Sequence, residues 1–260
     1  MERVQMRIAA CYKNVPDNEK IKLAPDNSLD LSAAAPQIGQ YDLNAVEAAV
    51  EIAAGQPGTE IIALTVAGDV IDNTKQRKAI LSRGADRMVG VKGEFENADT
   101  FEIASAIAAA VEKLGDVDLL IFGEGSADMY AQQTGVAAGA ILGWPNVNAV
   151  SHLELEADGS LLVRRDTESS SETIRVKLPA VVSVTSDINR PRIPSMKDIL
   201  AAGKKPVEVL DAAQLGLSSQ AAAELVSIRA QEQKARACQV YETASDEALD
   251  ALAQEIRKLM

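Results

Sequence analysis

The residues of this chain that are best suited to binding chemistry lie in one loop, residues 123–135, which follows an apolar segment at residues 118–122. Glycines at its start allow a ligand to approach the backbone closely. Hydroxyl and amide side chains at its end can donate to phosphate oxygens beside the helix expected next, where free amides and the helix dipole favour an anion. The loop therefore predicts a phosphate site, against the alternative of a ligand-free connection. It comprises Gly123, Glu124, Gly125, Ser126, Ala127, Asp128, Met129, Tyr130, Ala131, Gln132, Gln133, Thr134 and Gly135.

Other binding and catalytic motifs are incomplete. A GxGxxG pattern over the loop would place Asp128 at the third glycine, and no convincing acid follows about 20 residues later, so the dinucleotide fingerprint is rejected. The sequence has no P-loop motif. His152 is the single histidine and has no paired acid or cysteine, so we expect neither a metal site nor histidine-based nucleophilic catalysis.

Alternating segments predict an α/β fold. Strands are expected at residues 8–12, 60–66, 88–91 and 118–122, and helices at residues 43–54, 73–83, 100–114 and 132–142. Strands separated by helices of this length favour a mostly parallel, doubly wound, Rossmann-like sheet. Ala157-Asp158-Gly159-Ser160, between residues 150–156 and 161–165, predicts an antiparallel hairpin addition. Strands are also expected at residues 173–178 and 180–185.

The end of the chain differs from the rest. Residues 221–241 lack a clear helical period and are expected to form an extended arm. Ser245 is expected to cap a final helix whose apolar stripe is Leu249, Leu252, Ile256 and Leu259. The stripe could pack on its own domain or on a partner. We therefore divide the chain into an α/β domain, residues 1–217, and an arm with an amphipathic helix, residues 218–260.

Composition narrows the classes of partner. The 260 residues carry a formal charge of −12, which disfavours nucleic acid and anionic membrane surfaces. No apolar run approaches the roughly 20 residues that cross a bilayer, and the start does not resemble a signal peptide. Cys11 and Cys238 are the only cysteines, so reduced thiols and a cytoplasmic location are expected.

A second distinctive segment is the proline-containing stretch at residues 186–205, which follows the expected strand 180–185. Pro191 and Pro194 fix the backbone and remove N–H donors, so the loop is expected to be stiff and exposed. It also places Arg190 and Arg192 on an otherwise acidic protein. These features indicate a surface exposed for contact with a partner, although an ordinary loop between a strand and a helix has the same local signals.

Several segments together resemble the β subunit of electron-transfer flavoproteins, over about residues 5–217. The segments, in order, are RIAACYKNVPD (7–17), GQYDLNAVEAAV (39–50), GADR (84–87), DLLIFGEGSADMYAQQTG (118–135), GWP (143–145) and NRPR…PSM…I…A…KKP (189–206). The Tyr-Ala-Gln-Gln run is similar to the branch associated with carnitine reduction and nitrogen fixation. Only one acid, Asp128, stands in the family's acidic run of up to three.

The resemblance implies a nucleotide pocket in this chain that holds AMP or, in electron-bifurcating members, a second FAD. The residues carried over are Cys11, Gly39, Gln40, Tyr41, Asp42, Val66 and the loop from Gly123 to Gly135. Tyr41 corresponds to an aromatic residue near the flavin that is shared with the α subunit, or it is a half-buried core residue.

The resemblance also implies docking of a redox partner. The implied docking residues are Arg192, Ile193, Pro194, Ser195, Met196 and Ile199. Met196 is the expected anchor in a pocket of a dehydrogenase or reductase, unless it points inward and fills a local gap. The implied protein is an electron carrier, not an enzyme, that forms a heterodimer with an α subunit. A stand-alone adenine-nucleotide-binding enzyme or regulator on the same fold is the alternative.

Overall fold

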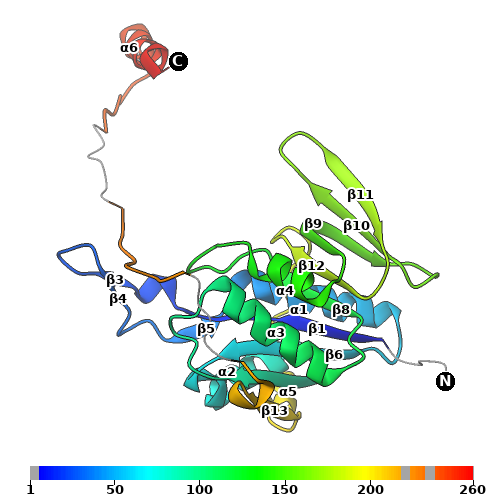
Figure 1. Ribbon diagram of the computed structural model, residues 1–260. Helices are drawn as coiled ribbons and strands as arrows, with labels where there is room; N and C mark the ends of the chain where they lie inside the picture. The colour runs from blue at the N-terminus through cyan, green and yellow to red at the C-terminus, as the bar shows by residue number, and fades with distance from the viewer. Residues whose placement is uncertain (1–5, 218–222, 232–237, 260) are drawn as a thin grey trace.

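The computed structural model describes residues 6–217, 223–231 and 238–259. In the described chain one nine-stranded sheet has the order β11-β10-β9-β12-β8-β1-β6-β7-β13 (Figure 1). Its strands are β1 (Arg7–Cys11), β6 (Glu60–Ala67), β7 (Arg87–Lys92), β8 (Leu119–Gly123), β9 (Asn146–Leu155), β10 (Leu161–Asp166), β11 (Ser171–Val176), β12 (Ala180–Val184) and β13 (Val207–Asp211). From β12 to β13 all neighbours are parallel.

The connections place helices on both faces of this sheet. The helices are α1 (Gln40–Gly55), α2 (Thr74–Leu81), α3 (Thr100–Leu114), α4 (Thr134–Leu142), α5 (Met196–Ala202) and α6 (Asp246–Leu259). One buried cluster joins the sheet to α1, α2 and α5, and a second joins it to α3 and α4. Figure 1 shows α3 and α4 in front of the sheet. The predicted doubly wound α/β fold is confirmed.

The strand order reverses beside β1. From β1 the chain continues to β6 and β7 on one side, and then crosses to β8 on the other side of β1. In open α/β sheets, ligands bind in the crevice that such a reversal leaves at the carboxyl ends of the strands. Cys11 ends β1 and Gly123 ends β8, so both lie at this crevice.

The antiparallel addition is also confirmed. The first half of β9 pairs with β12 in parallel, and its second half pairs with β10 in antiparallel orientation. β10 in turn pairs with β11 in antiparallel orientation. The hairpin turn follows from Gly159, whose φ of +79° is a backbone conformation that glycine adopts without strain.

Small elements supplement the sheet. Two short antiparallel pairs are formed by β2 (Asn14–Pro16) with β5 (Pro36–Ile38), and by β3 (Lys22–Leu23) with β4 (Leu29–Asp30). Single 3-10 turns are η1 (Asn18–Lys20), η2 (Asp69–Asp72) and η3 (Ala213–Leu215). None of these elements, nor β13 at the edge of the large sheet, was predicted from the sequence.

The described part of the arm passes the β3–β4 hairpin, and α6 lies apart from the domain (Figure 1). The Ser245 hydroxyl accepts from the Ala248 N–H at 3.3 Å, so the predicted cap is present. Leu249, Leu252 and Ile256 are 53%, 45% and 50% exposed. The described members of the stripe are therefore not covered by the domain. The side chain of Leu259, the fourth predicted member, lies outside the described side chains.

Candidate functional site

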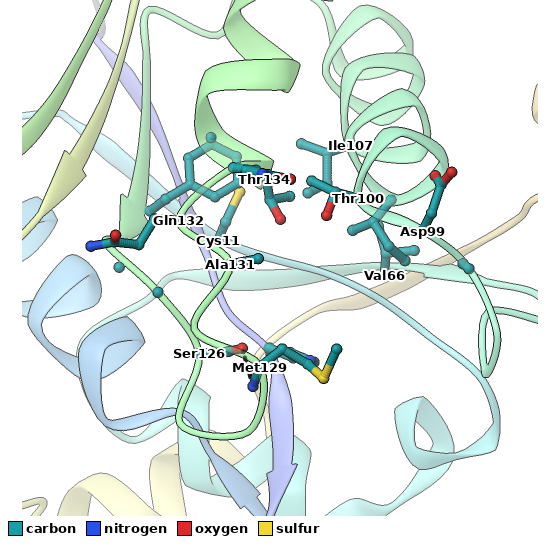
Figure 2. Close-up of a pocket in the computed structure, with 18 of the residues that line it drawn as sticks. Cys11, Val66, Asp99, Thr100, Ile107, Ser126, Met129, Ala131, Gln132 and Thr134 are labelled. Atoms are coloured by element: carbon teal, nitrogen blue, oxygen red, sulfur yellow. Dashed lines mark hydrogen bonds between the residues drawn. The ribbon is translucent and has the colours of Figure 1, made fainter. Parts of the chain in front are cut away.

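A cavity of about 380 Å³ lies at the carboxyl ends of β1, β6 and β8, at the reversal of strand order. Figure 2 shows its walls: Cys11 from β1, Val66 from β6, the loop after β8, and the first turns of α3 and α4. Ile103, Ile107 and Phe122 give one wall an apolar surface, whereas the loop after β8 makes another wall polar. The cavity thus has the composition of a site for an organic ligand with a polar group.

Two helices begin at the cavity, and they differ in their capping. α3 starts with a capping box: the Glu102 N–H donates to Asp99 Oδ1 at 2.9 Å, and the Asp99 N–H donates to the Glu102 carboxylate. α4 starts at Thr134, and its N-cap residue, Gln133, makes no side-chain cap hydrogen bond. The amides in the first turn of α4 are therefore better placed than those of α3 to receive an anion.

Close packing fixes the start of α4. A Cβ on Gly135 would lie 2.5 Å from Ser183 Oγ and 3.1 Å from the Phe122 ring, so only glycine fits without displacement. Ser183 lies on β12 and also lines the cavity. Thr134 and Thr100 face the same space from the two helices (Figure 2). The residues present therefore fit a phosphate group at α4.

The loop before α4 is held by its own polar contacts and by Lys13. Lys13 Nζ lies 2.9 and 2.7 Å from the two carboxylate oxygens of Asp128, and the Tyr130 N–H donates to the Ser126 carbonyl at 2.9 Å. Burial alone would raise the pKa of Asp128, but hydrogen bonds and the charge of Lys13 hold it below its usual value. Tyr130 and Gln132 have φ of +45° and +56°, which is a strained conformation for side chains of this size.

Asp42 is a buried carboxyl group in the lining of the cavity. Its Oδ2 accepts from the Lys13 N–H at 2.8 Å, and the Gly123 backbone also donates to the carboxylate. Burial raises the pKa of Asp42 to about 7, because these hydrogen bonds and the charge of Lys13 offset the loss of water only in part. Burial also raises the pKa of the Cys11 thiol, and the nearby Asp42 charge adds to this. Cys11 is therefore a neutral wall residue.

An aromatic pair lies outside the cavity. The rings of Tyr41 and Tyr130 are 5.4 Å apart and inclined by 49°, and the Tyr130 hydroxyl donates to Glu124 Oε1 at 3.0 Å. Tyr130 covers Gly125, where a Cβ would lie 2.5 Å from its ring. Tyr41 is half-buried and Tyr130 exposed, so the pair offers a partly open aromatic surface.

The structure brings together most of the predicted pocket. The predicted residues that line it are Cys11, Asp42, Val66, Gly123, Glu124, Gly125, Ser126, Met129, Ala131, Gln132, Gln133, Thr134 and Gly135. The others, Gly39, Gln40, Tyr41, Ala127, Asp128 and Tyr130, are outside this lining and adjoin it. Lining residues that were not predicted from the sequence include Lys13, Ser183, the start of α3 and the arm residues Ala223, Glu224 and Leu225. The sequence did offer a signal for the start of α3: residues 96–100 follow β7, whose carboxyl end lies at the same edge of the sheet as those of β1 and β8.

The second predicted surface also has a defined geometry. Ser195 caps α5 in a capping box with Asp198, and Met196 is the first residue of that helix. Met196 is 71% exposed and Ile193 93% exposed, so the alternative in which Met196 fills a local gap is wrong. Arg192 instead directs its guanidinium to Glu47 on α1, at 2.7 Å. Pro194 stands in the sequence between Ile193 and the cap residue Ser195. Ile199 is partly exposed on α5.

Among residues 6–217, 223–231 and 238–259, no group of three or more histidine, cysteine or acidic side chains could hold a metal ion. His152 is exposed on β9 and lies 3.9 Å from the Glu154 carboxylate. Within the same ranges, no helix has the length and apolar character that crossing a bilayer requires.

The comparison with known families agrees with this fold. Residues 29–215 match the family model of the electron transfer flavoprotein domain, which spans every element from β4 to η3 and the whole loop after β8. Membership associates the chain with electron transfer and with flavin or adenine nucleotides. The match covers well over half of the sequence, and the chain belongs to the electron transfer flavoprotein domain family.

Proposed function

We propose that this chain is the β subunit of a heterodimeric electron-transfer flavoprotein and that its own cavity holds a nucleotide phosphate at the start of α4. One observation carries the nucleotide site: a helix without a side-chain cap begins inside a cavity at the reversal of strand order. Free amides at such a terminus bind anions. Gly135 supports this assignment, because its missing Cβ lets the helix start lie close to Ser183.

The other walls suit the rest of a nucleotide. Val66 and Ile107 lie across from the polar loop (Figure 2), and with Ile103 they give the cavity an apolar surface on which a base can lie. The ligand is AMP or a second FAD. The volume of about 380 Å³ is near the lower end of the roughly 300–1,000 Å³ usual for ligand pockets, which favours AMP.

The partner surfaces complete the proposal. An α subunit would bind the arm and α6, residues 218–260, whose described apolar stripe is exposed. A dehydrogenase or reductase would bind the loop that carries Ile193 and Met196. FAD shared with the α subunit would supply the redox chemistry, and the Tyr41–Tyr130 pair is a partly open aromatic surface at the nucleotide loop, to which Tyr130 belongs. The chain would carry electrons without transforming a substrate.

Binding of AMP and FAD to two variants tests the nucleotide site. Thr134→Val removes the hydroxyl at the start of α4, and Gly125→Leu forces the loop away from Tyr130. A hydrogen bond to a charged group is worth about 1.5–3 kcal/mol, so Thr134→Val should weaken binding by roughly tenfold or more in calorimetry. Gly125→Leu should also weaken binding, because it displaces the loop. Thr74→Val is the matched control, because it removes a hydroxyl from the first residue of α2, a capped helix whose start does not line the cavity. Unchanged affinity for both nucleotides in both variants would refute the site.

Expression with and without an α subunit tests the class of protein. A colourless chain that becomes yellow only with its partner supports AMP in this subunit, whereas a yellow chain alone supports FAD. A stable monomer that turns over ATP would instead establish the stand-alone nucleotide enzyme.

A further inference from the structure

We propose that residues 223–230 of the C-terminal arm form a strap over the nucleotide cavity, and that release of the strap sets the rate at which the nucleotide leaves. This inference rests on the proposed nucleotide site and adds a control on exchange. It concerns a segment that lies outside the residues matched by the family model.

The first end of the strap is part of the cavity. Ala223, Glu224 and Leu225 line the cavity beside the start of α3. The Ala223 N–H donates to Asp99 Oδ2 at 3.3 Å, so the strap is attached to the residue that caps α3. In Figure 2, Asp99 and Thr100 stand at the edge of the cavity next to Val66. A ligand placed between α4 and Val66 therefore has the strap as one of its walls.

The second end of the strap is held by the β3–β4 hairpin. Arg229 forms an isolated antiparallel bridge with Ser28, and the Ala230 N–H donates to the Asn27 carbonyl at 2.9 Å. Asn27 lies in the turn between the two short strands. Figure 1 shows this orange part of the arm running past the hairpin. The strap is thus attached at both ends to parts of the domain that are distant in sequence.

The contacts that hold the strap on the domain contribute much less stability than the packing of the core. Leu225, Val226 and Ile228 are 49%, 88% and 45% exposed, so the strap buries little apolar surface. Single backbone hydrogen bonds add little net stability. Segments with few buried contacts open at a much lower free energy than the sheet. The strap can therefore open while the domain stays folded, and a partner bound to α6 would restrain it.

The test compares the release of radiolabelled AMP from the full chain and from an Ala223→Pro/Ala230→Pro variant, after addition of excess unlabelled AMP. Proline has no backbone N–H, so the variant loses the hydrogen bonds that Ala223 and Ala230 donate. Both positions lie outside helices and named strands. The variant should release AMP roughly tenfold faster, as expected for the loss of two modest hydrogen bonds. Val240→Pro, which alters an 80% exposed residue farther along the arm, should release AMP at the wild-type rate.

Trypsin gives a second measurement, because Arg229 lies in the strap. Saturating AMP should slow cleavage after Arg229 in the wild-type chain. If both chains retain AMP equally long, or if AMP does not change this cleavage, the strap is refuted while the nucleotide site stands. If neither AMP nor FAD binds the wild type or any variant, the nucleotide site fails and the strap fails with it.

Discussion

The Glu47 carboxylate on α1 accepts three hydrogen bonds from Arg192: one from its backbone N–H at 3.0 Å, and two from its guanidinium at 2.7 and 2.8 Å. Asn44, one turn earlier, donates to the Asn189 carbonyl at 3.0 Å. Both contacts join α1 to the loop before α5. Because α1 also carries Asp42 beside the cavity, one helix supports both the proposed nucleotide site and the proposed docking loop.

Glu47→Gln should loosen the docking loop. Glu47 is almost buried and Arg192 half-exposed, so breaking the pair should cost about 1–2 kcal/mol, below the 3–5 kcal/mol typical of fully buried pairs. We expect a lower melting temperature and slower electron transfer to the partner, with unchanged AMP content.

Glu172→Gln is the control for this variant. It breaks the 2.6 Å pair with Arg165 on the β10–β11 hairpin, which is separate from the loop. It should leave the transfer rate unchanged. Equal transfer rates in the Glu47 and Glu172 variants would contradict a positioning role for Glu47.

The fold was predictable where apolar residues repeat with a clear period. The core strands and α3 were expected almost at their observed ends, because both faces of the sheet are buried. β13 was missed because only Leu210 is buried in it and its apolar pattern is therefore faint. Its pairing with β7 connects residues more than a hundred positions apart, which no local pattern reveals.

The site was predictable to the extent that it is continuous in sequence. The loop after β8 was found because its glycines and polar residues follow one strand. Ala223 and Asp99 meet across 124 positions, and Ser183 reaches the cavity from β12. Such residues have no distinguishing neighbours in the sequence, and only the packed sheet brings them to one place.

Asp42 should make stability depend on pH. Its pKa is about 7 in the folded chain and near 3.8 when exposed. Between these values the folded state holds a proton that the unfolded state lacks, so this contribution is complete below about pH 4 and is lost as the pH rises through 7. The loss should be about 2–4 kcal/mol.

Urea unfolding of the wild type and Asp42→Asn between pH 4 and 8 measures this effect. Glu47 and Asp128, whose pKa values are lowered, act in the opposite direction but are present in both proteins. The Asn variant should therefore gain stability relative to the wild type as the pH rises. A difference that is the same at every pH would show that Asp42 stays ionised when folded.

The exposed stripe of α6 should be required for assembly with the α subunit. Leu252→Asp places a charge in this stripe and should greatly reduce co-purification, since burying an unpaired charge is costly. Gln254→Asp adds the same charge on the opposite side of the helix and should co-purify normally. Equal yields from the two variants would exclude this face of α6 as the contact surface.

Met196→Ala tests the docking loop at its proposed anchor. Met196 is 71% exposed, so its truncation leaves no internal cavity and should not change the melting temperature. An unbranched methionine adapts to an irregular pocket, and the loop is already fixed by Glu47 and two prolines, which lowers the cost of ordering on association. If Met196 is an anchor, truncation should cost about 2 kcal/mol and slow electron transfer to the partner roughly thirtyfold at limiting partner concentration.

Leu23→Ala is the control for this variant. It removes a comparably exposed side chain, 58%, from the β3–β4 hairpin, and the variant should transfer electrons at the wild-type rate. A normal rate for Met196→Ala would assign the anchor to another exposed residue of the loop, with Ile193, at 93% exposure, as the next to truncate.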